Sequence, residues 1–365
     1  MKKRVLVLIT LMDRAGAETL AMNYLRELDR EKYHIDFLIN RKEKSDYEDE
    51  IESLGCHVYH MCALKPFKVR QYIKEFNEFL DSQKPYDIIH SHLEEKSVYA
   101  FRIAKKRGIK TRIIHCHSNP KIKDLKYFMR IYLKKKLKNL YTVGLACSKK
   151  SAKWLLNNIN VELIKNCVDT EKFKFNKDKR EKLRKELDVG GLVITHVGRF
   201  SKEKNQEFIL KVFSEIIKEK DATLLMVGQA KTKSEKKIRR KLVDKMYLLG
   251  IESHVKFLGM REDMENIYSM SDIVIMPSLS EGFPMTLVEA QTSGCKCIAS
   301  DRITKKVNIT GNVRFVSLNS KPKKWSEIIL NTDISADRNN AYIKVRDEGY
   351  DIKKVIKKLE RIYSE

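Results

Sequence analysis

The chain has 365 residues and carries 74 lysine and arginine side chains against 49 aspartate and glutamate side chains, a formal net charge of +25 at neutral pH. This length favours two domains, each large enough to bury its own core. With 42% hydrophobic residues and only 6 prolines and 14 glycines, the composition excludes a disordered or collagen-like chain. The excess positive charge predicts a polyanionic partner, either nucleic acid or an anionic membrane.

Short apolar runs alternate with amphipathic segments of helical spacing along the whole chain. Between residues 1 and 170 we expect helices at 19–28, near 45–54 and at 69–82, and strands at 5–10, 34–39, 57–60, 87–90, 111–115 and 145–146. A segment rich in lysine and acidic residues, 171–188, is interpreted as the interdomain connection. The alternation then restarts, with strands at 193–197, 223–227, 255–258, 272–276 and 297–300.

Strand–helix alternation of this kind is typical of parallel sheets with helices on both faces. The sequence therefore predicts an α/β protein of two Rossmann-like, doubly wound domains, an N-terminal one at 1–170 and a C-terminal one at 190–348. In such sheets, ligands bind beyond the carboxyl ends of the strands. The loops after the strands are where functional residues are expected.

No segment predicts a membrane anchor or an exported protein. The apolar run 5–12 is too short to span a bilayer, and it ends in Asp13 and Arg14 without a cleavage site. The seven cysteines are an odd number with no C-x-x-C pair, and Cys295 and Cys297 would point to opposite faces of a strand. We therefore expect a cytoplasmic protein with neither a disulfide framework nor a structural zinc site.

The positive charge of the first half is concentrated in one stretch. Residues 102–138 hold 14 basic side chains and one acidic side chain. Within 121–141, apolar and aromatic residues recur at helical spacing with lysines between them, which predicts a basic amphipathic helix. It fits an ordinary helix docked on its own domain, or a surface that meets the anionic inner face of a membrane. Nucleic acid is less favoured because no nucleic-acid-binding motif accompanies the charge.

Motifs for the common nucleotide cofactors are absent. The fingerprint G-x-G-x-x-G does not follow the first strand of either domain, which disfavours nicotinamide and flavin chemistry. The chain also lacks a P-loop and the G-x-S-x-G nucleophile elbow.

The segment 280–290 follows the expected strand 272–276 and carries the most specific pattern in the chain. Pro284 suits the first position of a helix, so the backbone N–H groups after it would form an anion site. Glu281 precedes that helix, and Glu289 lies about 7.5 Å along its axis. Because carboxylates repel phosphate, we expect them to accept hydrogen bonds from hydroxyl groups on either side of the anion. Hydroxyl, diphosphate and hydroxyl in that order is the layout of a nucleotide sugar.

Cationic side chains follow the first strand of the second domain. Arg199 and Lys204 come just after the expected strand 193–197, and Gly198 permits close approach of the backbone to a ligand. Charged donors contribute roughly 1.5–3 kcal/mol per hydrogen bond to phosphate. The same bonds would stabilise the charge on a departing diphosphate. In the first domain, Gly16 follows the first strand, opens a helix and would likewise let the backbone approach a ligand.

Histidines lie at and just after the ends of two expected strands of the first domain, 87–90 and 111–115. Alternation places His90 and His92 on one face of their strand, and His115 and His117 likewise. Imidazoles are metal ligands, but without cysteine pairs or an acidic residue nearby the pattern favours His90 and His115 as buried histidines with hydrogen-bond partners. His117, one step past its strand, is the better candidate for contact with a ligand. No metal site is expected.

The chain resembles glycosyltransferase family 4, whose members are retaining enzymes with the GT-B fold, and within it the bacterial capsular and exopolysaccharide glycosyltransferases. The resemblance covers nearly the whole chain. Its most specific part is the pair Glu281 and Glu289 together with the segment Gly198-Arg199-Phe200. Further matching segments are 16–19, 87–92, 146–148 and 165–169.

The resemblance implies that the two domains face a central cleft and that a C-terminal helix, 349–365, crosses back to pack on the first domain. In the second domain, Arg199 and Lys204 would bind the donor diphosphate. Glu289 would hold the ribose, and Glu281 the transferred sugar. Close to the donor would lie further residues of this domain: Gly198, Phe283, Pro284, Met285, Thr286 and Leu287.

From the first domain, the resemblance implies that Gly16 lies over the diphosphate and that His117 contacts the donor sugar near the reacting carbon. The family transfers a sugar with retention of configuration and needs no metal or other cofactor, and this sequence contains no Asp-x-Asp motif. The implied reaction moves a sugar from a UDP-sugar to a lipid-linked saccharide, at the inner surface of the plasma membrane, in capsular or exopolysaccharide biosynthesis.

Two positions depart from the family pattern. Cys167 replaces a common glycine in the turn before the second domain, and the turn Gly228-Gln229-Ala230 lacks its second glycine.

Two other functions stay open. A UDP-sugar 2-epimerase shares the two-domain architecture but uses no acceptor. A nucleic-acid-binding protein would use the basic helix. A GDP-sugar donor also stays open beside a UDP-sugar.

Overall fold

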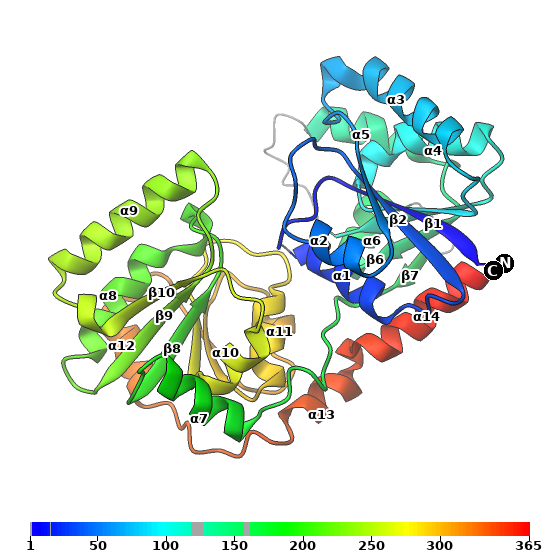
Figure 1. The fold of residues 1–365 in the computed structure, drawn as a ribbon. Helices are drawn as coiled ribbons and strands as arrows, with labels where there is room; N and C mark the ends of the chain where they lie inside the picture. Colours follow the sequence, from blue (N-terminus) through cyan, green and yellow to red (C-terminus); the bar gives the residue numbers. More distant parts are fainter. Residues whose placement is uncertain (1, 15, 118–126, 157–160) are drawn as a thin grey trace. The chain divides into compact units, whose positions relative to one another are not determined.

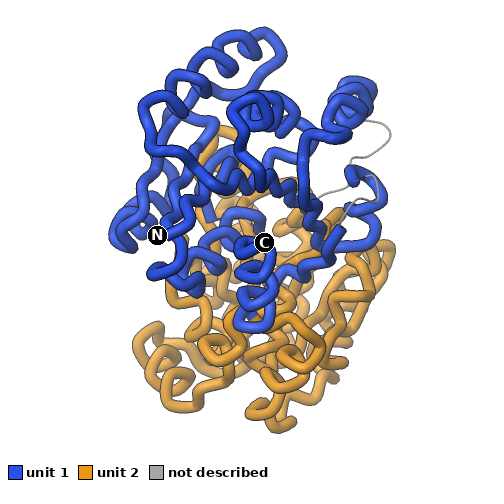
Figure 2. Tube along the Cα trace, turned by 90° about the vertical axis from the view of Figure 1, so that its right-hand side faces the viewer, with its two compact units in different colours: residues 1–167, 352–365 blue, residues 168–351 orange. Residues whose placement is uncertain are grey.

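The computed structural model describes residues 2–14, 16–117, 127–156 and 161–365. It divides into two compact units, unit 1 with residues 1–167 and 352–365, and unit 2 with residues 168–351 (Figure 2). Each unit is built on one parallel sheet with helices on both faces (Figure 1). The predicted fold class, two Rossmann-like domains, is therefore confirmed.

The sheet of unit 1 has the strand order β3-β2-β1-β4-β5-β6-β7. Its order reverses beside β1, because β1 pairs with β2 on one side and with β4 on the other. The strands are β1 (Lys3–Ile9), β2 (Tyr33–Ile39), β3 (His57–His60), β4 (Ile88–Ser91), β5 (Thr111–Cys116), β6 (Val143–Ala146) and β7 (Val161–Leu163).

Two separate apolar cores lie on the two faces of this sheet. Alternate residues of β1 enter different cores, Val5 and Val7 on one face and Leu6 and Leu8 on the other. The first core is covered by α1 (Gly16–Glu27), α2 (Glu48–Ser53) and α14 (Ile352–Ser364). The second is covered by α3 (Val69–Ser82), α4 (Val98–Lys106), α5 (Tyr127–Leu137) and α6 (Lys149–Leu155).

Helix α14 belongs to unit 1 although it ends the chain. It packs on α1, and Figure 1 shows it in red beside the blue helix of the N-terminal segment. Its buried residues recur at helical spacing: Ile352, Val355, Ile356, Leu359, Ile362 and Tyr363. On its polar side, Lys358 and Arg361 contact Glu162 of β7 at 2.9 and 2.8 Å. The helix thus covers the core that α1 alone would leave open.

The sheet of unit 2 has the order β10-β9-β8-β11-β12-β13, with α8, α9 and α12 on one face and α7, α10, α11 and α13 on the other. Its strands are β8 (Leu192–Val197), β9 (Ala222–Val227), β10 (Val255–Gly259), β11 (Ile273–Met276), β12 (Lys296–Ser300) and β13 (Val313–Val316). Its helices are α7 (Lys177–Glu186), α8 (Gln206–Ile216), α9 (Lys233–Leu248), α10 (Met264–Met270), α11 (Met285–Thr292), α12 (Pro322–Leu330) and α13 (Ala341–Val345).

The segment 171–188, interpreted from the sequence as a connection, is instead part of unit 2. It contains α7, which packs on α10, and the chain leaves unit 1 earlier, after Cys167. Arg180 and Arg184 of α7 contact the carboxylate of Asp272 at 2.5 and 2.7 Å. A helix held mainly by ion pairs has few apolar residues, so its sequence resembles a linker.

The chain passes from unit 1 to unit 2 after Cys167 and returns to unit 1 after Asp351. The first and last residues of unit 2 are neighbours in a hydrogen-bonded bridge. Val168 forms a parallel bridge with Asp351, and the Val168 N–H donates to the Tyr350 carbonyl at 2.9 Å. The Thr170 hydroxyl donates to the carboxylate of Asp351, and both side chains are buried.

All seven cysteines are free thiols. Among the described residues, no helix combines the length and apolar character needed to span a bilayer.

Candidate active site

The loops after β8 and β11, which are neighbouring strands, bring two predicted site residues together. Lys204 ends a short 3-10 turn, Lys202–Lys204, and Glu281 lies between β11 and α11. The Lys204 Nζ atom is 2.8 Å from Glu281 Oε1, and the two side chains are 20% and 15% exposed. A Cβ atom on Gly198 would lie 3.0 Å from Lys204 Cε, so the missing side chain gives the lysine stem its place.

Backbone and amide hydrogen bonds hold these two loops against each other. The Leu279 N–H donates to the Glu203 carbonyl at 2.8 Å, and Asn205 Nδ2 donates to the Pro277 carbonyl at 3.2 Å. Asn205 has a left-handed backbone with φ of 54°, which asparagine adopts more readily than most residues. The cation and the carboxylate are therefore presented on a joined and fixed pair of loops.

Helix α11 begins one residue later than the sequence indicates. Pro284 is the residue before the helix, and Met285 and Thr286 open it with partly exposed side chains. Leu287 is buried, and its N–H donates to the Pro284 carbonyl at 3.1 Å, so this residue contributes to packing. The start of α11 favours an anion because the helix dipole is positive there. Phe283 stacks on Tyr350, with ring centroids 5.7 Å apart and planes 2° apart.

Glu289 is positioned by a tyrosine that the sequence did not identify. Tyr268 of α10 is fully buried, and its hydroxyl donates to Glu289 Oε2 at 2.8 Å. Burial raises the pKa of Glu289, although the hydrogen bond from Tyr268 and the charge of Lys172 act in the opposite direction. The contact orients the carboxylate. It joins residues 21 positions apart, and no local pattern predicts such a pairing.

Two further residues of unit 2 line the same strand ends. Arg199 is exposed just after β8, and its carbonyl accepts a hydrogen bond from Gln206 Nε2 at 2.7 Å. Gly228, which follows β9, has φ of +148°, and a Cβ atom there would lie 2.1 Å from the Gly198 carbonyl oxygen. The turn 228–230 thus keeps the glycine that its geometry requires, although it lacks the second one of the family pattern.

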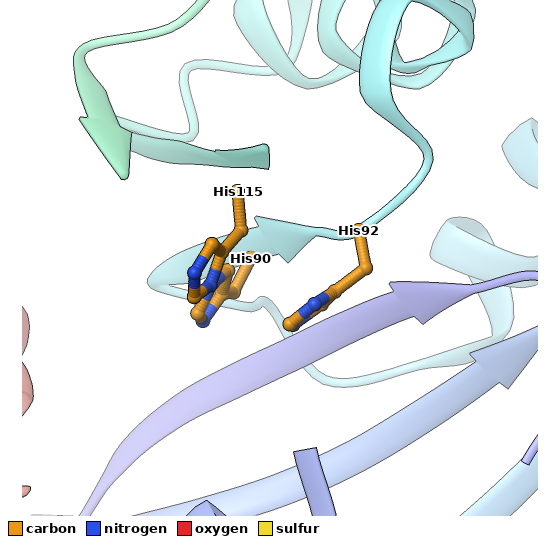
Figure 3. Close-up of side chains that lie close together, drawn as sticks. All are labelled: His90, His92 and His115. Atoms are coloured by element: carbon orange, nitrogen blue, oxygen red, sulfur yellow. The ribbon is translucent and has the colours of Figure 1, made fainter. Parts of the chain in front are cut away.

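In unit 1, the four predicted histidines lie together at the ends of β4 and β5: His90, His92 and His115 are buried (Figure 3), and His117 is partly buried. His90 Nε2 is 3.3 Å from His115 Nδ1, and His92 Nδ1 is 2.8 Å from His117 Nε2. The rings within these pairs are nearly parallel, at 8° and 11°. His90 Nδ1 also contacts the Tyr363 hydroxyl of α14 at 2.7 Å. His90 and His115 are therefore buried with partners, as predicted.

Burial keeps these imidazoles neutral. It lowers the pKa of His90 to about 3 and that of His117 to about 4, and it holds the pKa values of His92 and His115 well below the usual range. One nitrogen each of His90, His92 and His115 lies within 4.8 Å of the others, which is close enough for a metal. However, lone pairs lie in the ring planes, and stacked rings do not direct them to one point. The arrangement fits hydrogen bonding better than coordination.

His117 and Gly16 are the two candidates from unit 1. His117 is partly buried beyond β5, and its Nδ1 has no hydrogen-bond partner within the described residues. Gly16 is exposed and is the first residue of α1, and a Cβ atom there would meet nothing within 4 Å. His117 lies after the carboxyl end of β5 and Gly16 after that of β1, and β4 separates these two strands in the unit 1 sheet.

Both units match known protein families. Residues 14–172 match the model described as Glycosyltransferase Family 4, and residues 177–334 match the model described as Glycosyl transferases group 1. The chain is a family 4 glycosyltransferase. The first matched segment includes β2 to β7 of unit 1 and the second includes all the described strands of unit 2, so the family resemblance in the sequence is confirmed.

The glycosyltransferase is similar over its whole length to bacterial relatives. It is 29% identical to the putative glycosyltransferase EpsF of Bacillus subtilis, with 100% of this chain and 97% of EpsF covered. It is 26% identical to the capsular polysaccharide biosynthesis glycosyltransferase CapH of Staphylococcus aureus, with 99% and 98% covered. The UDP-Gal:alpha-D-GlcNAc-diphosphoundecaprenol alpha-1,3-galactosyltransferase of Escherichia coli is 27% identical over 63% of this chain and 60% of its own.

Solved structures share the GT-B fold of this glycosyltransferase. The crystal structure of Anabaena Alr3699/HepE in complex with UDP-glucose has a TM-score of 0.76 and 19% sequence identity, and the superposition covers 99% of both chains. At this identity the likeness concerns the fold. Within unit 2, the structure brings Lys204 and Glu281 into contact. It places Glu289 in the same helix whose start follows the Glu281 loop.

Proposed function

We propose that this glycosyltransferase transfers a sugar from a UDP-sugar to a lipid-linked saccharide, with retention of configuration, in the synthesis of a capsular or extracellular polysaccharide. The observation that carries the proposal is the arrangement around the start of α11. One carboxylate, Glu281, precedes the positive end of the helix beside the cation of Lys204, and a second, Glu289, follows within it. This order of groups matches that of a nucleotide sugar, in which hydroxyl groups lie on both sides of a diphosphate.

The roles of the donor-binding residues follow from their chemistry. Lys204 and Arg199 would neutralise the diphosphate and the start of α11 would add backbone donors, including those of Met285 and Thr286. Glu289, oriented by Tyr268, would accept hydrogen bonds from the ribose hydroxyls. Glu281 would bind hydroxyls of the transferred sugar. His117 would contact this sugar as a neutral imidazole, since its pKa is lowered to about 4.

Transfer is proposed to need no metal or other cofactor. A departing UDP gains negative charge as the bond to the sugar breaks, and preorganised cationic donors stabilise such charge. Arg199 and Lys204 supply two cations for that purpose. An excess of chelator is therefore expected to leave the transfer rate unchanged, whereas loss of activity that added Mg²⁺ restores would contradict this part of the proposal.

The donor and the reaction type are tested with the purified protein. UDP-sugars and GDP-sugars are first compared for the increase in melting temperature that each causes, because a ligand that binds only the folded state raises it. The stabilising sugar is then incubated with lipid-diphosphate-linked saccharide, and the anomeric configuration of the product is determined by NMR. Conversion of the UDP-sugar without acceptor would favour the 2-epimerase, and inversion would contradict retention. The name of the Escherichia coli relative supports the choice of acceptor.

Peripheral membrane binding is proposed for α5. Leu133 and Leu137 face the core, whereas Phe128 and Tyr132 are 82% and 58% exposed. Exposed lysines, Lys135 among them, share the outer surface of the helix. Aromatic rings would enter the headgroup region, and each lysine near an anionic surface contributes about 1 kcal/mol. Residues 121–126 of the predicted basic helix lie outside the described residues.

Flotation with liposomes tests this surface. We expect the protein to float with vesicles that contain phosphatidylglycerol and to remain at the bottom with pure phosphatidylcholine. The double variant Phe128→Ser and Tyr132→Ser should lose most of this binding. Leu248→Ser, which removes a side chain 77% exposed on unit 2, is the matched control. Binding that ignores lipid charge, or that survives the double variant, would contradict the proposal.

A further inference from the structure

Two histidines and one aspartate of unit 1 converge at a place that the glycosyl transfer does not use. His34 and Asp36 lie two residues apart on β2, so their side chains leave the same face of the sheet. His57 begins β3, and its partner across the ladder is Asp36. Regular strand geometry thus brings the three side chains together, near the amino-terminal ends of β2 and β3. The predicted donor residues of unit 1 lie beyond the carboxyl ends of the strands.

The nitrogen and oxygen atoms of this group have the spacing of metal ligands. His34 Nε2 is 3.1 Å from Asp36 Oδ1, and His57 Nδ1 is 3.2 Å from the same oxygen. One ligand atom from each of the three residues lies within 4.8 Å of those from the other two. Around a tetrahedral Zn²⁺, with bonds of about 2.0–2.2 Å, neighbouring ligand atoms are roughly 3.3 Å apart. An ion can therefore enter with small rotations of the side chains.

The surroundings would also hold the ligands in place. Asp36 Oδ2 accepts a hydrogen bond from the Tyr86 hydroxyl at 2.8 Å and contacts Arg4 Nη2 at 2.9 Å. These contacts fix the carboxylate and leave Oδ1 toward the histidines, as outer-shell partners of metal ligands do. Asp36 is fully buried, but the side chains of His34 and His57 are 31% and 63% exposed. An ion from solvent can reach them.

We propose that His34, Asp36 and His57 form a binding site for Zn²⁺ or a similar divalent transition metal, with water in the remaining position. The rings of His34 and His57 are tilted by 51°, and both present a nitrogen to one carboxylate oxygen. The stacked histidines around His90 have neither this convergence nor an acidic ligand. The ion would link β2 to β3, which is the short edge strand of the sheet, and would stabilise unit 1.

The test measures binding of Zn²⁺ to the full chain by calorimetry, and the spectrum of bound Co²⁺ as a report on its ligands. We expect one ion per chain, a higher melting temperature with Zn²⁺, and at least a tenfold loss of affinity in His57→Asn. His60→Asn is the matched control, because His60 is an exposed histidine at the end of the same strand with Glu48 as its neighbour. This control should bind Zn²⁺ like the wild type.

Three results would overturn the assignment. They are no binding of Zn²⁺ at millimolar concentration, equal affinity in His57→Asn and the wild type, and loss of binding in His60→Asn alone. If His57→Asn is less stable without metal, His34→Gln provides the second variant, and it should lose affinity to the same extent. The site is independent of the donor site, so removal of the metal should lower the melting temperature without changing UDP affinity.

Discussion

Lys204 and Glu281 form an ion pair in the free enzyme, so replacing Lys204 should weaken UDP binding, whereas replacing Glu281 should leave UDP binding unchanged or strengthen it. UDP carries the diphosphate but no sugar, so it would use Lys204 and not Glu281. Lys204→Ala removes a charged donor to phosphate, which costs about 1.5–3 kcal/mol. This corresponds to roughly 10- to 150-fold weaker binding of UDP. Transfer should be abolished because the charge on the leaving diphosphate would lose one of the two cations proposed to stabilise it.

Glu281→Gln keeps the size of the side chain and removes its charge. It frees Lys204 from a pair whose side chains are 20% and 15% exposed, so the pair contributes on the order of 1 kcal/mol. UDP should then bind unchanged or up to about fivefold more tightly, while transfer should fall because the neutral amide offers the sugar hydroxyls one acceptor oxygen in place of two charged ones. Calorimetry with UDP and a transfer assay at saturating donor separate the two effects.

Lys202→Ala is the matched control, because Lys202 is an exposed lysine in the same short turn. It should retain both UDP binding and transfer. Circular dichroism melting shows whether each variant is folded. Equal UDP affinity in Lys204→Ala and the wild type would refute the assignment of Lys204 to the diphosphate. A marked loss of UDP affinity in Glu281→Gln would refute the idea that the pair competes with the donor.

Three further predictions concern buried groups. Tyr268→Phe removes the hydrogen bond to Glu289, worth about 1.5 kcal/mol or more, so calorimetry should show about tenfold weaker UDP binding with the fold intact. Asp272→Ala removes the carboxylate that both arginines of α7 contact, and urea unfolding should show a loss of about 3–5 kcal/mol; a loss below 1 kcal/mol would count against the ion pairs. Finally, the folded-state pKa values of His90 and His117, about 3 and about 4, lie below the unfolded value of about 6.5. Stability should therefore be constant above pH 6.5 and fall toward pH 4, by about 1.4 kcal/mol per pH unit for each neutral histidine. Urea unfolding between pH 4 and pH 8 measures this slope, and a flat profile would contradict buried neutral imidazoles.

The succession of strands and helices along the chain could be predicted from the sequence because the hydrophobic patterns that indicate them are local. Buried parallel strands are short apolar runs, and the helices between them show their spacing within a dozen residues. The expected helix 69–82 coincides with α3. The edge strands β7 and β13 were missed, since both carry exposed or partly exposed residues and lack a continuous apolar run. The helix α7 was missed for a related reason, because Leu183 is its one buried residue.

The residues of the donor site could likewise be proposed from local spacing, since Glu281, Pro284 and Glu289 lie on one loop and helix. What only the tertiary structure decided are contacts between distant segments. Examples are the pairing of Lys204 with Glu281, the support of Glu289 by Tyr268, and the convergence of His34 and His57 on Asp36. Such contacts depend on which strands become neighbours in the sheet, and strand order is a property of the whole chain. The sequence alone therefore identifies the chemical groups of the candidate site, whereas the tertiary packing determines which groups contact one another.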